Sequence, residues 1–483
     1  MRRKFLVNIV FLLAVSLIIK TFWVLGIDRS VQNIAGEEAY GFYFSLFSFS
    51  VLFTLVLDMG LSGFNNRAVS ADPSRVKLYF GNVLLLRLVL TVVYFAITLT
   101  AAWLMGYSGR QISLLLILML NQFMASLTLW LRSNISGMQY LILDSLLSMA
   151  DRLLMIIICS LLLWGGMTAS PFRIEWFVWS QTAAYFTVMA VSFVIVIRRG
   201  GVSAIRPDAS VLRGIIVSGL PYALVVFTMT IYWRIDSVLI ERLLPDGAVR
   251  AGYYAQAFRL FDAFSMIPVM FGSLLLPIFS KEHAAGNDIT PLASMASGML
   301  LVPVGIIAVT MATFSKEILD LLYTSSVESA VQPFRILMVT LIPVGLTYIY
   351  STMMTAAGLI RKLGLITGTA LAVNLSLNLL LIPSLAGTGA AVASLAAQLI
   401  VASLCIIAVH RSMARVLVPR RVVLFILLLL ITLATGLICR TTAAPWPLAA
   451  ALQLIVGTSW ALIFRLVEPL KSLKLILERR NSI

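Results

Sequence analysis

The sequence predicts an all-α integral membrane protein with about fourteen transmembrane helices. Of the 483 residues, 60% are hydrophobic and only 12% are charged, whereas a soluble chain carries about 25% charged residues. The mean hydropathy of +1.01 agrees with this composition. Apolar runs of about 20 residues, long enough to cross about 30 Å of hydrocarbon, recur along the whole chain. Lipid is therefore the expected solvent of most of the protein.

The apolar runs can be placed in order along the chain. The first follows Met1-Arg2-Arg3-Lys4. It is too long for a signal peptide and lacks a small-residue cleavage site, so we expect an uncleaved span. The connections between runs are short, so we expect no soluble catalytic domain. The approximate spans are 5–26, 40–62, 79–105, 111–132, 140–164, 174–197, 213–240, 252–280, 292–314, 332–358, 362–382, 386–409, 421–440 and 446–467.

The excess of positive charge predicts the orientation. The chain has 36 Lys and Arg against 20 Asp and Glu, a formal net charge of +16. In a soluble domain this balance would suggest nucleic acid, but in a membrane protein the Lys and Arg of short loops stay on the cytoplasmic side. With the N-terminus inside, most of the basic residues fall on that side. We therefore expect both termini in the cytoplasm and no nucleic-acid partner.

Motifs of metal binding and catalysis are missing from the sequence. Its three cysteines, Cys159, Cys405 and Cys439, lie inside apolar runs without the spacing of a disulfide framework or a metal site. It contains no GxxxxGK[ST], HExxH or GxSxG pattern. Both histidines, His283 and His410, lie in loops or at a helix end, so any coupling to protons or sodium would depend on Asp. We expect no enzyme, no metal and no cofactor.

A short pattern occurs twice, six spans apart. Ala39-Tyr40-Gly41 precedes the second span, and Ala251-Gly252-Tyr253-Tyr254 precedes the eighth. An even number of spans gives both halves the same orientation, as in transporters whose halves are related by an axis along the membrane normal. We expect two six-helix lobes around a central cavity. The N-lobe would cover residues 1–200 and the C-lobe 201–412, with a C-terminal helix pair and basic tail over 413–483.

Proline and glycine predict bends and close contacts within the spans. Four prolines each remove a backbone hydrogen bond and bend their helices, either as flexing points or as static shape: Pro221, Pro268, Pro303 and Pro343. Gly364 and Gly368 form a small-xxx-small pair, which predicts close helix packing in the eleventh span.

Charged side chains inside the spans are the candidate functional residues. A charge near the bilayer centre costs about 2.5–3.5 kcal/mol on insertion scales, so such residues normally face a polar interior. Lys20, Arg234 and Arg259 lie at similar depth in the outer halves of the first, seventh and eighth spans. Three cations at one level predict a chamber for an anion, and the guanidinium forks match phosphate or carboxylate.

The other charges have interpretations that the sequence leaves open. Arg152 in the fifth span can reach a neighbouring helix, as a structural or a substrate contact. Asp58 and Asp236 are candidates for proton or sodium coupling, or else ion-pair partners of a nearby Arg. Arg87 and Asp58 lie near the cytoplasmic ends of their spans, where an Arg side chain can snorkel to the interface.

Three groups of residues point to a particular protein family more specifically than the overall composition does. They are Glu38-Ala-Tyr-Gly-Phe-Tyr with Leu57-Asp-Met-Gly-Leu, Trp233-Arg-Ile-Asp-Ser-Val-Leu-Ile with Ala251-Gly-Tyr-Tyr-Ala, and Asn374-Leu-Ser-Leu-Asn with Gly387-Thr-Gly-Ala-Ala. In order and spacing, from about residue 38 to 400, they resemble the polysaccharide-biosynthesis (Wzx-type) oligosaccharide flippases of the multidrug/oligosaccharidyl-lipid/polysaccharide superfamily.

The resemblance implies a transporter in the bacterial inner membrane, with two lobes that rock to give alternating access. The implied substrate is an undecaprenyl-diphosphate-linked oligosaccharide, flipped to the periplasmic leaflet for O-antigen or exopolysaccharide synthesis. Further partners would be membrane lipids and a polysaccharide polymerase or export machinery. The expected substrate contacts are Lys20, Arg234 and Arg259, then Asp58, Asp236 and Arg152.

Several other functions stay open. A lipid II flippase of the same superfamily fits as well, because many oligosaccharide flippases have twelve helices and this chain has two more. A multidrug exporter fits less well, since a cationic chamber would repel cationic drugs. A glycan polymerase or ligase would be expected to have a large external loop, which this sequence lacks. A non-transporting subunit of an export complex is the remaining alternative.

Overall fold

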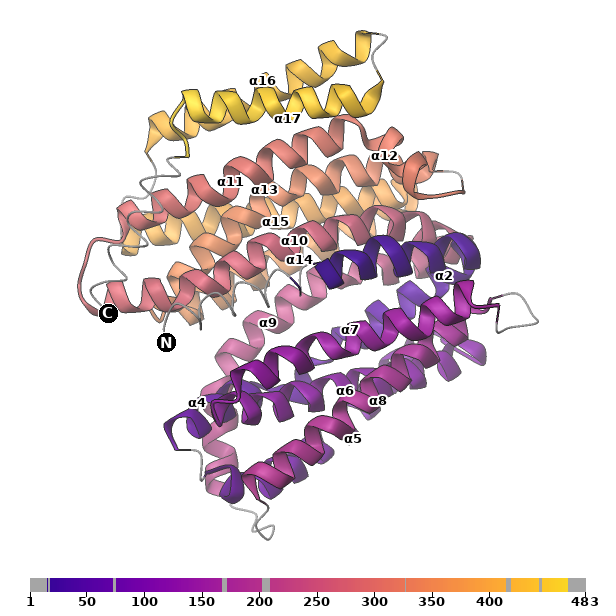
Figure 1. The fold of residues 1–483 in the computed structure, drawn as a ribbon, viewed down its shortest axis with the longest axis vertical. Coiled ribbons are helices and arrows are strands. Elements are labelled where there is room, and N and C mark those ends of the chain that lie inside the picture. Colours follow the sequence, from indigo (N-terminus) through magenta and orange to yellow (C-terminus); the bar gives the residue numbers. More distant parts are fainter. Residues whose placement is uncertain are drawn as a thin grey trace. The chain divides into compact units, whose positions relative to one another are not determined.

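All regular elements in the described part of the chain are helices, which confirms the all-α class (Figure 1). The computed structural model describes residues 15, 18–72, 75–166, 172–201, 209–325, 327–413, 418–442 and 445–467. The chain divides into two compact units, residues 1–255 and 256–483. The repeat boundaries expected at residues 200 and 412 stay a prediction.

The first unit is built around α2, α6 and α8, because α6 packs against both of the others and α2 also packs against α9. Its core includes Trp130, Leu131, Phe80 and Val196, all almost fully buried. The helices are η1 (Trp23–Asp28), α2 (Arg29–Leu52), α3 (Leu55–Asp58), α4 (Leu61–Ala71), α5 (Arg75–Leu104), α6 (Arg110–Gly137), α7 (Leu141–Trp164), α8 (Ile174–Gly200), α9 (Ala209–Leu243) and the start of α10 (Gly247–Ala284).

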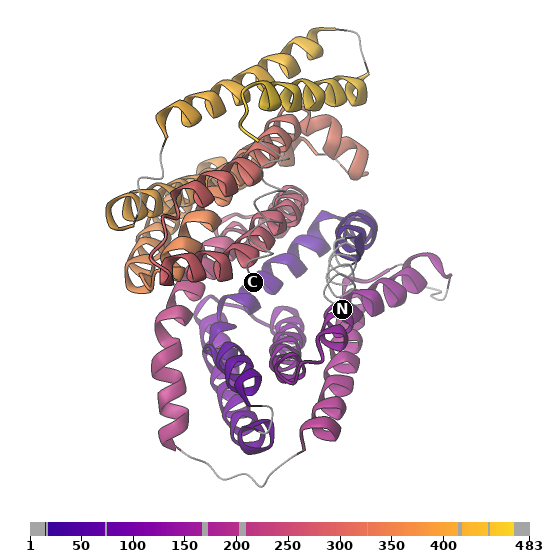
Figure 2. The same cartoon turned by 60° about the vertical axis from the view of Figure 1, so that its left-hand side comes forward.

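The second unit has α13 at its centre, because α13 packs against both α11 and α15, and α14 covers α15. The last two helices, α16 and α17, lie side by side and against α11 (Figures 1 and 2). Besides the rest of α10, the helices are α11 (Thr290–Thr313), α12 (Ser315–Leu322), α13 (Glu328–Ala356), α14 (Ile360–Leu385), α15 (Gly387–Ser412), α16 (Pro419–Thr441) and α17 (Trp446–Ile463).

The α16–α17 pair is held on α11 and α12 by close packing at a glycine and by polar contacts. A Cβ on Gly305 of α11 would lie 2.8 Å from a methyl group of Leu429, so the helices approach closely there. Gln453 is fully buried and donates to Thr313 Oγ1 at 3.4 Å. Arg440 pairs with Glu317 at 2.6 Å. These contacts make the C-terminal pair an integral part of the second unit.

Twelve described helices are long and apolar enough to cross a membrane, and they coincide with the third to fourteenth predicted spans. The second predicted span corresponds to a bent pair, 18–52 with 55–63. Most of the first, 5–26, lies outside the described residues. The described part therefore holds twelve or thirteen spans, and the count of fourteen stays a prediction.

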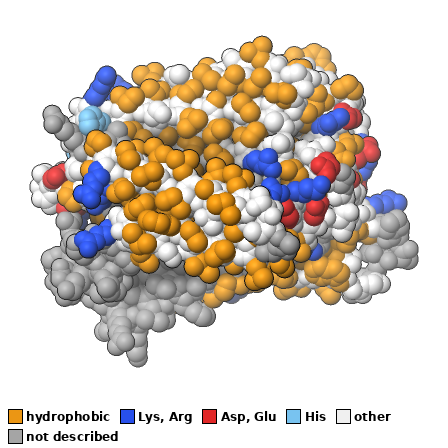
Figure 3. Space-filling view, turned by 90° about the horizontal axis from the view of Figure 1, so that it is seen from above, with side chains coloured by type: hydrophobic (Ala, Val, Ile, Leu, Met, Phe, Trp, Pro, Cys, Tyr) orange, Lys and Arg blue, Asp and Glu red, His pale blue; other side chains and the backbone are white. Residues whose placement is uncertain are grey.

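The surface agrees with a lipid environment. On the face of the second unit seen in Figure 3, hydrophobic side chains cover the middle, and charged ones gather toward the two ends. Leu448, Ile455 and Ile463 of α17 are each more than 60% exposed. Apolar side chains of this size are left exposed when the surrounding solvent is hydrocarbon.

The glycine prediction for the eleventh span is wrong at Gly368. A Cβ there would meet no atom of the described residues within 4 Å, so none of the described helices packs closely against it. The close approach in this part of the second unit is at Gly389 of α15, where a Cβ would lie 2.6 Å from the carbonyl oxygen of Leu381 in α14. The predicted prolines do lie inside helices, Pro221 in α9, Pro268 in α10, Pro303 in α11 and Pro343 in α13.

Candidate functional site

A break in the second span brings polar backbone and side chains together within the first unit. α2 ends at Leu52, α3 is a single turn, and Met59 and Gly60 then take left-handed φ angles of 42° and 82° before α4 begins. Gly60 faces Gly219 of α9, where an added Cβ would lie 2.7 Å from the Met59 carbonyl oxygen. Inside a membrane, such irregular backbone is tolerated where it is covered by protein or lines a wet cavity.

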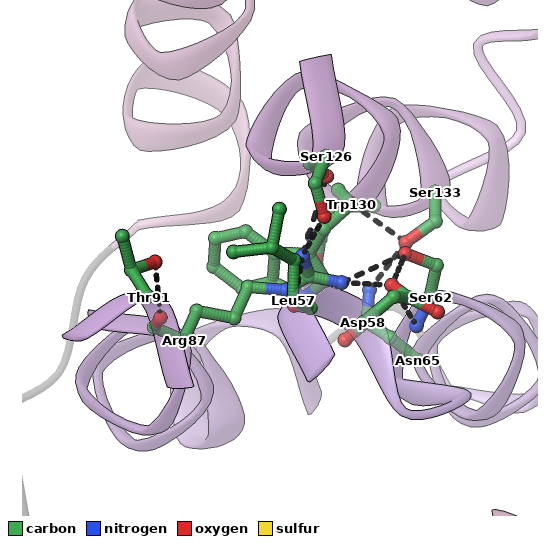
Figure 4. Close-up of polar contacts among 10 residues, drawn as sticks. Leu57, Asp58, Ser62, Asn65, Arg87, Thr91, Ser126, Trp130 and Ser133 are labelled. Carbon is green, nitrogen blue, oxygen red and sulfur yellow. Dashed lines mark hydrogen bonds and ion pairs between the residues drawn. The ribbon is translucent and has the colours of Figure 1, made fainter. Parts of the chain in front are cut away.

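Arg87 of α5 stabilises this break (Figure 4). Its guanidinium forms an ion pair with Asp58 Oδ1 and donates to Ser62 Oγ at 2.9 Å and Ser126 Oγ at 3.1 Å. It also donates to the carbonyl oxygens of Leu57 and Ser126 at 3.3 and 3.2 Å, and it lies over the Trp130 ring. The Arg87 side chain is 2% exposed. The snorkelling prediction is therefore wrong, because Asp58 and neutral acceptors solvate this cation inside the protein.

The Asp58 carboxylate is hydrogen-bonded within the protein and also borders a cavity. Oδ1 accepts hydrogen bonds from the Ser62 backbone and hydroxyl as well as from Arg87. The side chain is 29% exposed, and it borders a cavity of about 430 Å³ that we name the break pocket. The polar residues that line the break pocket come from the broken helix, α6 and α9, and they are Thr54, Asp58, Gln122, Ser126, Tyr222 and Thr230.

Lys20 lies in a second charged group of the first unit. Lys20 is half-buried, and its charge interacts with those of Arg152 and Asp151 on α7. The Arg152 guanidinium is 5.5 Å from the centre of the Trp23 ring and 4.0 Å from Asp151. This confirms that Arg152 reaches a neighbouring helix. The group therefore brings Lys20 and Arg152 close to the carboxylate of Asp151.

Arg234 lies on α9, with its guanidinium 6.0 Å from the centre of the Phe47 ring on α2. Asp236, two residues further, is 1% exposed and accepts a hydrogen bond from the Tyr254 hydroxyl at 2.8 Å. Contact of Arg234 or Asp236 with a substrate stays a prediction.

Arg259 belongs to the second unit, where it is half-buried on α10. A chamber that joins it with Lys20 and Arg234 stays a prediction as well. In the same unit, Asn374 and Asn378 of α14 are fully buried and joined by a hydrogen bond of 3.1 Å.

The repeated pattern forms a contact that the sequence did not predict. A Cβ on Gly41 would lie 1.9 Å from the Ala248 carbonyl oxygen, and one on Gly252 would lie 2.2 Å from that of Glu37. At the two copies of the pattern, α2 and α10 therefore cross with their backbones in direct contact. Their tyrosines play equivalent roles, because Tyr40 donates to buried Asp28 at 2.8 Å, as Tyr254 does to Asp236. Asp28 was not a candidate because it lies just beyond the first apolar run.

Among the residues that the structure describes, no three His, Cys, Asp or Glu side chains lie close enough together to hold a metal ion. The three cysteines are free and buried.

Comparison with known proteins identifies both sequence and fold relatives. The family model described as polysaccharide biosynthesis protein matches residues 6–283. None of the curated proteins compared gives a significant match. Among solved structures, the lipid II flippase MurJ in an inward closed conformation matches with a TM-score of 0.69 and 14% identity, over 93% of this chain and 98% of that one.

Two further structures have the same fold. An inward-facing multidrug resistance MATE family transporter matches with a TM-score of 0.61 and 15% identity, over 81% of this chain and 96% of that one. A MOP superfamily transporter from Pyrococcus furiosus matches with a TM-score of 0.57 and 16% identity, over 83% and 93%. At these identities the likeness establishes the fold, that of MOP superfamily transporters.

Proposed function

Because the chain belongs to the polysaccharide biosynthesis protein family, we propose that it flips an undecaprenyl-diphosphate-linked oligosaccharide across the bacterial inner membrane. The lipid-linked unit would enter from the cytoplasmic leaflet and leave in the periplasmic leaflet, to supply a surface polysaccharide such as O-antigen or exopolysaccharide. Both termini would be cytoplasmic, and a polymerase or export machinery would receive the product. The protein would act by alternating access and form no covalent intermediate.

The observation that carries the proposal is the set of basic side chains within apolar helices. Lys20, Arg152 and Arg234 lie in the first unit and Arg259 in the second. A guanidinium in a site of low dielectric constant binds a diphosphate through paired, charge-assisted hydrogen bonds. The same charges oppose a cationic drug, which disfavours a multidrug exporter.

Coupling of transport to protons or sodium is part of the proposal. Asp58 is the less suitable carrier, because Arg87 neutralises it and a bound proton would leave that cation buried without its partner. Asp236 would have to exchange its hydrogen bond with Tyr254 for the coupling ion.

A lipid II flippase is the second candidate. The likeness to MurJ covers 93% of the chain, whereas the likeness to the MATE transporter covers 81%. Lipid II and the oligosaccharide lipid share the undecaprenyl diphosphate, so the cationic residues serve either substrate. The two candidates differ only in the glycan.

The test is flipping by purified protein in proteoliposomes, with either lipid II or the source bacterium's own undecaprenyl-diphosphate-linked repeat unit. We expect Arg234→Ala and Arg259→Ala to abolish flipping and Arg→Lys at either position to retain part of it. Arg250→Ala is the matched control, because Arg250 is exposed on α10 and pairs only locally with Asp246. Full activity of both alanine variants would remove these cations from the mechanism.

A further inference from the structure

The break pocket differs from the cationic groups because its lining is polar but electrically neutral. Among the residues that the structure describes around it, Asp58 is the only one with a charge, and Arg87 compensates that charge. Such a pocket favours neither an anion nor a cation. It suits a neutral group that is rich in hydrogen-bonding atoms.

The polar groups of the break pocket match hydroxyl groups. The hydroxyls of Thr54 and Thr230 donate to their own helix backbones, at 2.7 and 2.8 Å, and so present their oxygens as acceptors. Gln122 offers both a donor and an acceptor, and the second oxygen of Asp58 is an acceptor. Tyr222 is 47% exposed and offers a ring face together with a hydroxyl. Acceptors, an amide and an aromatic face together are the means by which proteins bind sugar rings.

The size of the break pocket also fits a sugar. Its volume of about 430 Å³ falls within the range of about 300–1,000 Å³ typical of small-molecule sites. Leu55, Ala125 and Val226 lie among the polar groups and offer apolar contact to the ring carbons of a pyranose.

The break pocket adjoins the predicted diphosphate contact along α9. Tyr222, Val226 and Thr230 line it at intervals of four residues, and Arg234 continues the same helix face. Four residues of helix rise about 6 Å, so Thr230 lies one turn from Arg234. A sugar attached directly to a diphosphate held by Arg234 would reach this turn.

We propose that the break pocket binds a sugar of the lipid-linked glycan, next to the diphosphate, and thereby makes the protein prefer glycosylated carriers to bare undecaprenyl diphosphate. This inference rests on the proposed function and assigns its glycan subsite. The helix break supports it, because discontinuous membrane helices commonly form the substrate sites of transporters. Arg87 contributes by positioning Asp58 and cancelling its charge.

The experiment compares two probes on the purified full chain in nanodiscs. One is bare undecaprenyl diphosphate, and the other is the source bacterium's own undecaprenyl-diphosphate-linked repeat unit. The measured quantity is the ratio of their dissociation constants. We expect wild type to bind the glycosylated probe at least about tenfold more tightly, as one or two hydrogen bonds to a buried partner would give.

Two variants change the break pocket in different ways. Gln122→Leu removes the amide, and Ala125→Trp fills the space while keeping every hydrogen-bonding group. We expect each variant to bring the ratio close to one by weakening the binding of the glycosylated probe. The dissociation constant of the bare lipid should change by less than about twofold. Gln332→Leu is the matched control, since Gln332 is exposed on α13, and it should keep the wild-type ratio.

The outcomes separate this inference from the proposed function. The glycan subsite is overturned if the wild-type protein binds both probes with equal dissociation constants. It is also overturned if both pocket variants keep the same ratio of dissociation constants as wild type. Either result leaves the flippase proposal standing. If wild type binds neither probe, both proposals fail. If Arg234→Ala binds both probes like wild type while the pocket variants lose their preference, the subsite holds and the diphosphate contact at Arg234 is wrong.

Discussion

The ion pair at the helix break allows a prediction with an unusual sign. Asp58→Ala should destabilise the first unit more than Arg87→Met does, and adding Arg87→Met to Asp58→Ala should restore stability. The reason is the unequal burial of the two partners, 2% exposure for Arg87 against 29% for Asp58. Loss of the acid leaves a buried cation, whereas loss of the cation leaves a carboxylate that the break pocket still hydrates.

The structure sets the size of each effect. Removing one partner of a buried pair costs about 3–5 kcal/mol, and Arg87 would keep neutral acceptors on Ser62, Leu57 and Ser126, so we expect about 3 kcal/mol for Asp58→Ala. At about 2–4 °C per kcal/mol for a unit of this size, the melting temperature falls by about 6–12 °C. Arg87→Met should cost about 1–2 kcal/mol, because Ser62 still donates to the carboxylate.

The assay is thermal unfolding of the four proteins of this cycle in one detergent. The matched cycle is Asp246→Ala with Arg250→Met, an exposed i,i+4 pair at 2.9 Å whose coupling should be far smaller than that of Asp58 with Arg87. A double variant less stable than Asp58→Ala alone would refute the reasoning, since it would mean that the buried guanidinium is not the source of the cost.

The remaining predictions concern packing, pH and topology. Gly41→Ala should disrupt the helix crossing, as its Cβ would lie 1.9 Å from a backbone oxygen, whereas Gly368→Ala, in open space, should be neutral or slightly stabilising in the same thermal assay. The hydrogen bond to Glu328 raises the pKa of Lys316 above 10.5, so the advantage of wild type over Glu328→Gln in melting temperature should be complete below pH 10.5 and vanish as pH rises through the raised pKa. Reporter fusions after residues 170 and 205 should fall on the external and cytoplasmic sides, and the same side for both would refute the topology.

The helices could be predicted from the sequence because hydropathy is a local property. An apolar run of sufficient length forms a helix in lipid whatever its neighbours, since only intrahelical bonds can satisfy its backbone. The break between Leu52 and Leu61 was missed for the same reason. It lies inside an apolar run whose average hydropathy hides Asp58 and Gly60, and the left-handed angle at Met59 depends on contacts with α9 and on the Arg87 side chain.

The partners of the buried charges could not be predicted from depth alone. Arg87 and Asp58 are 29 residues apart, and their pairing requires α5 to lie beside α3. The repeated Tyr and Gly pattern indicated two related halves, but a repeat does not say that its copies touch. Gly41 and Gly252 do so because neither has a side chain to keep the backbones of α2 and α10 apart.

The neutralisation of Asp58 connects the ion pair with the proposed diphosphate contact. At a separation of about 8 Å, a free carboxylate would repel a phosphate by about 2 kcal/mol at an effective dielectric constant of about 20. That energy corresponds to about thirtyfold in affinity. Arg87→Met should therefore weaken the binding of bare undecaprenyl diphosphate by about this factor, although residue 87 itself would not contact the lipid. Unchanged affinity would show that the break pocket and the diphosphate are not neighbours.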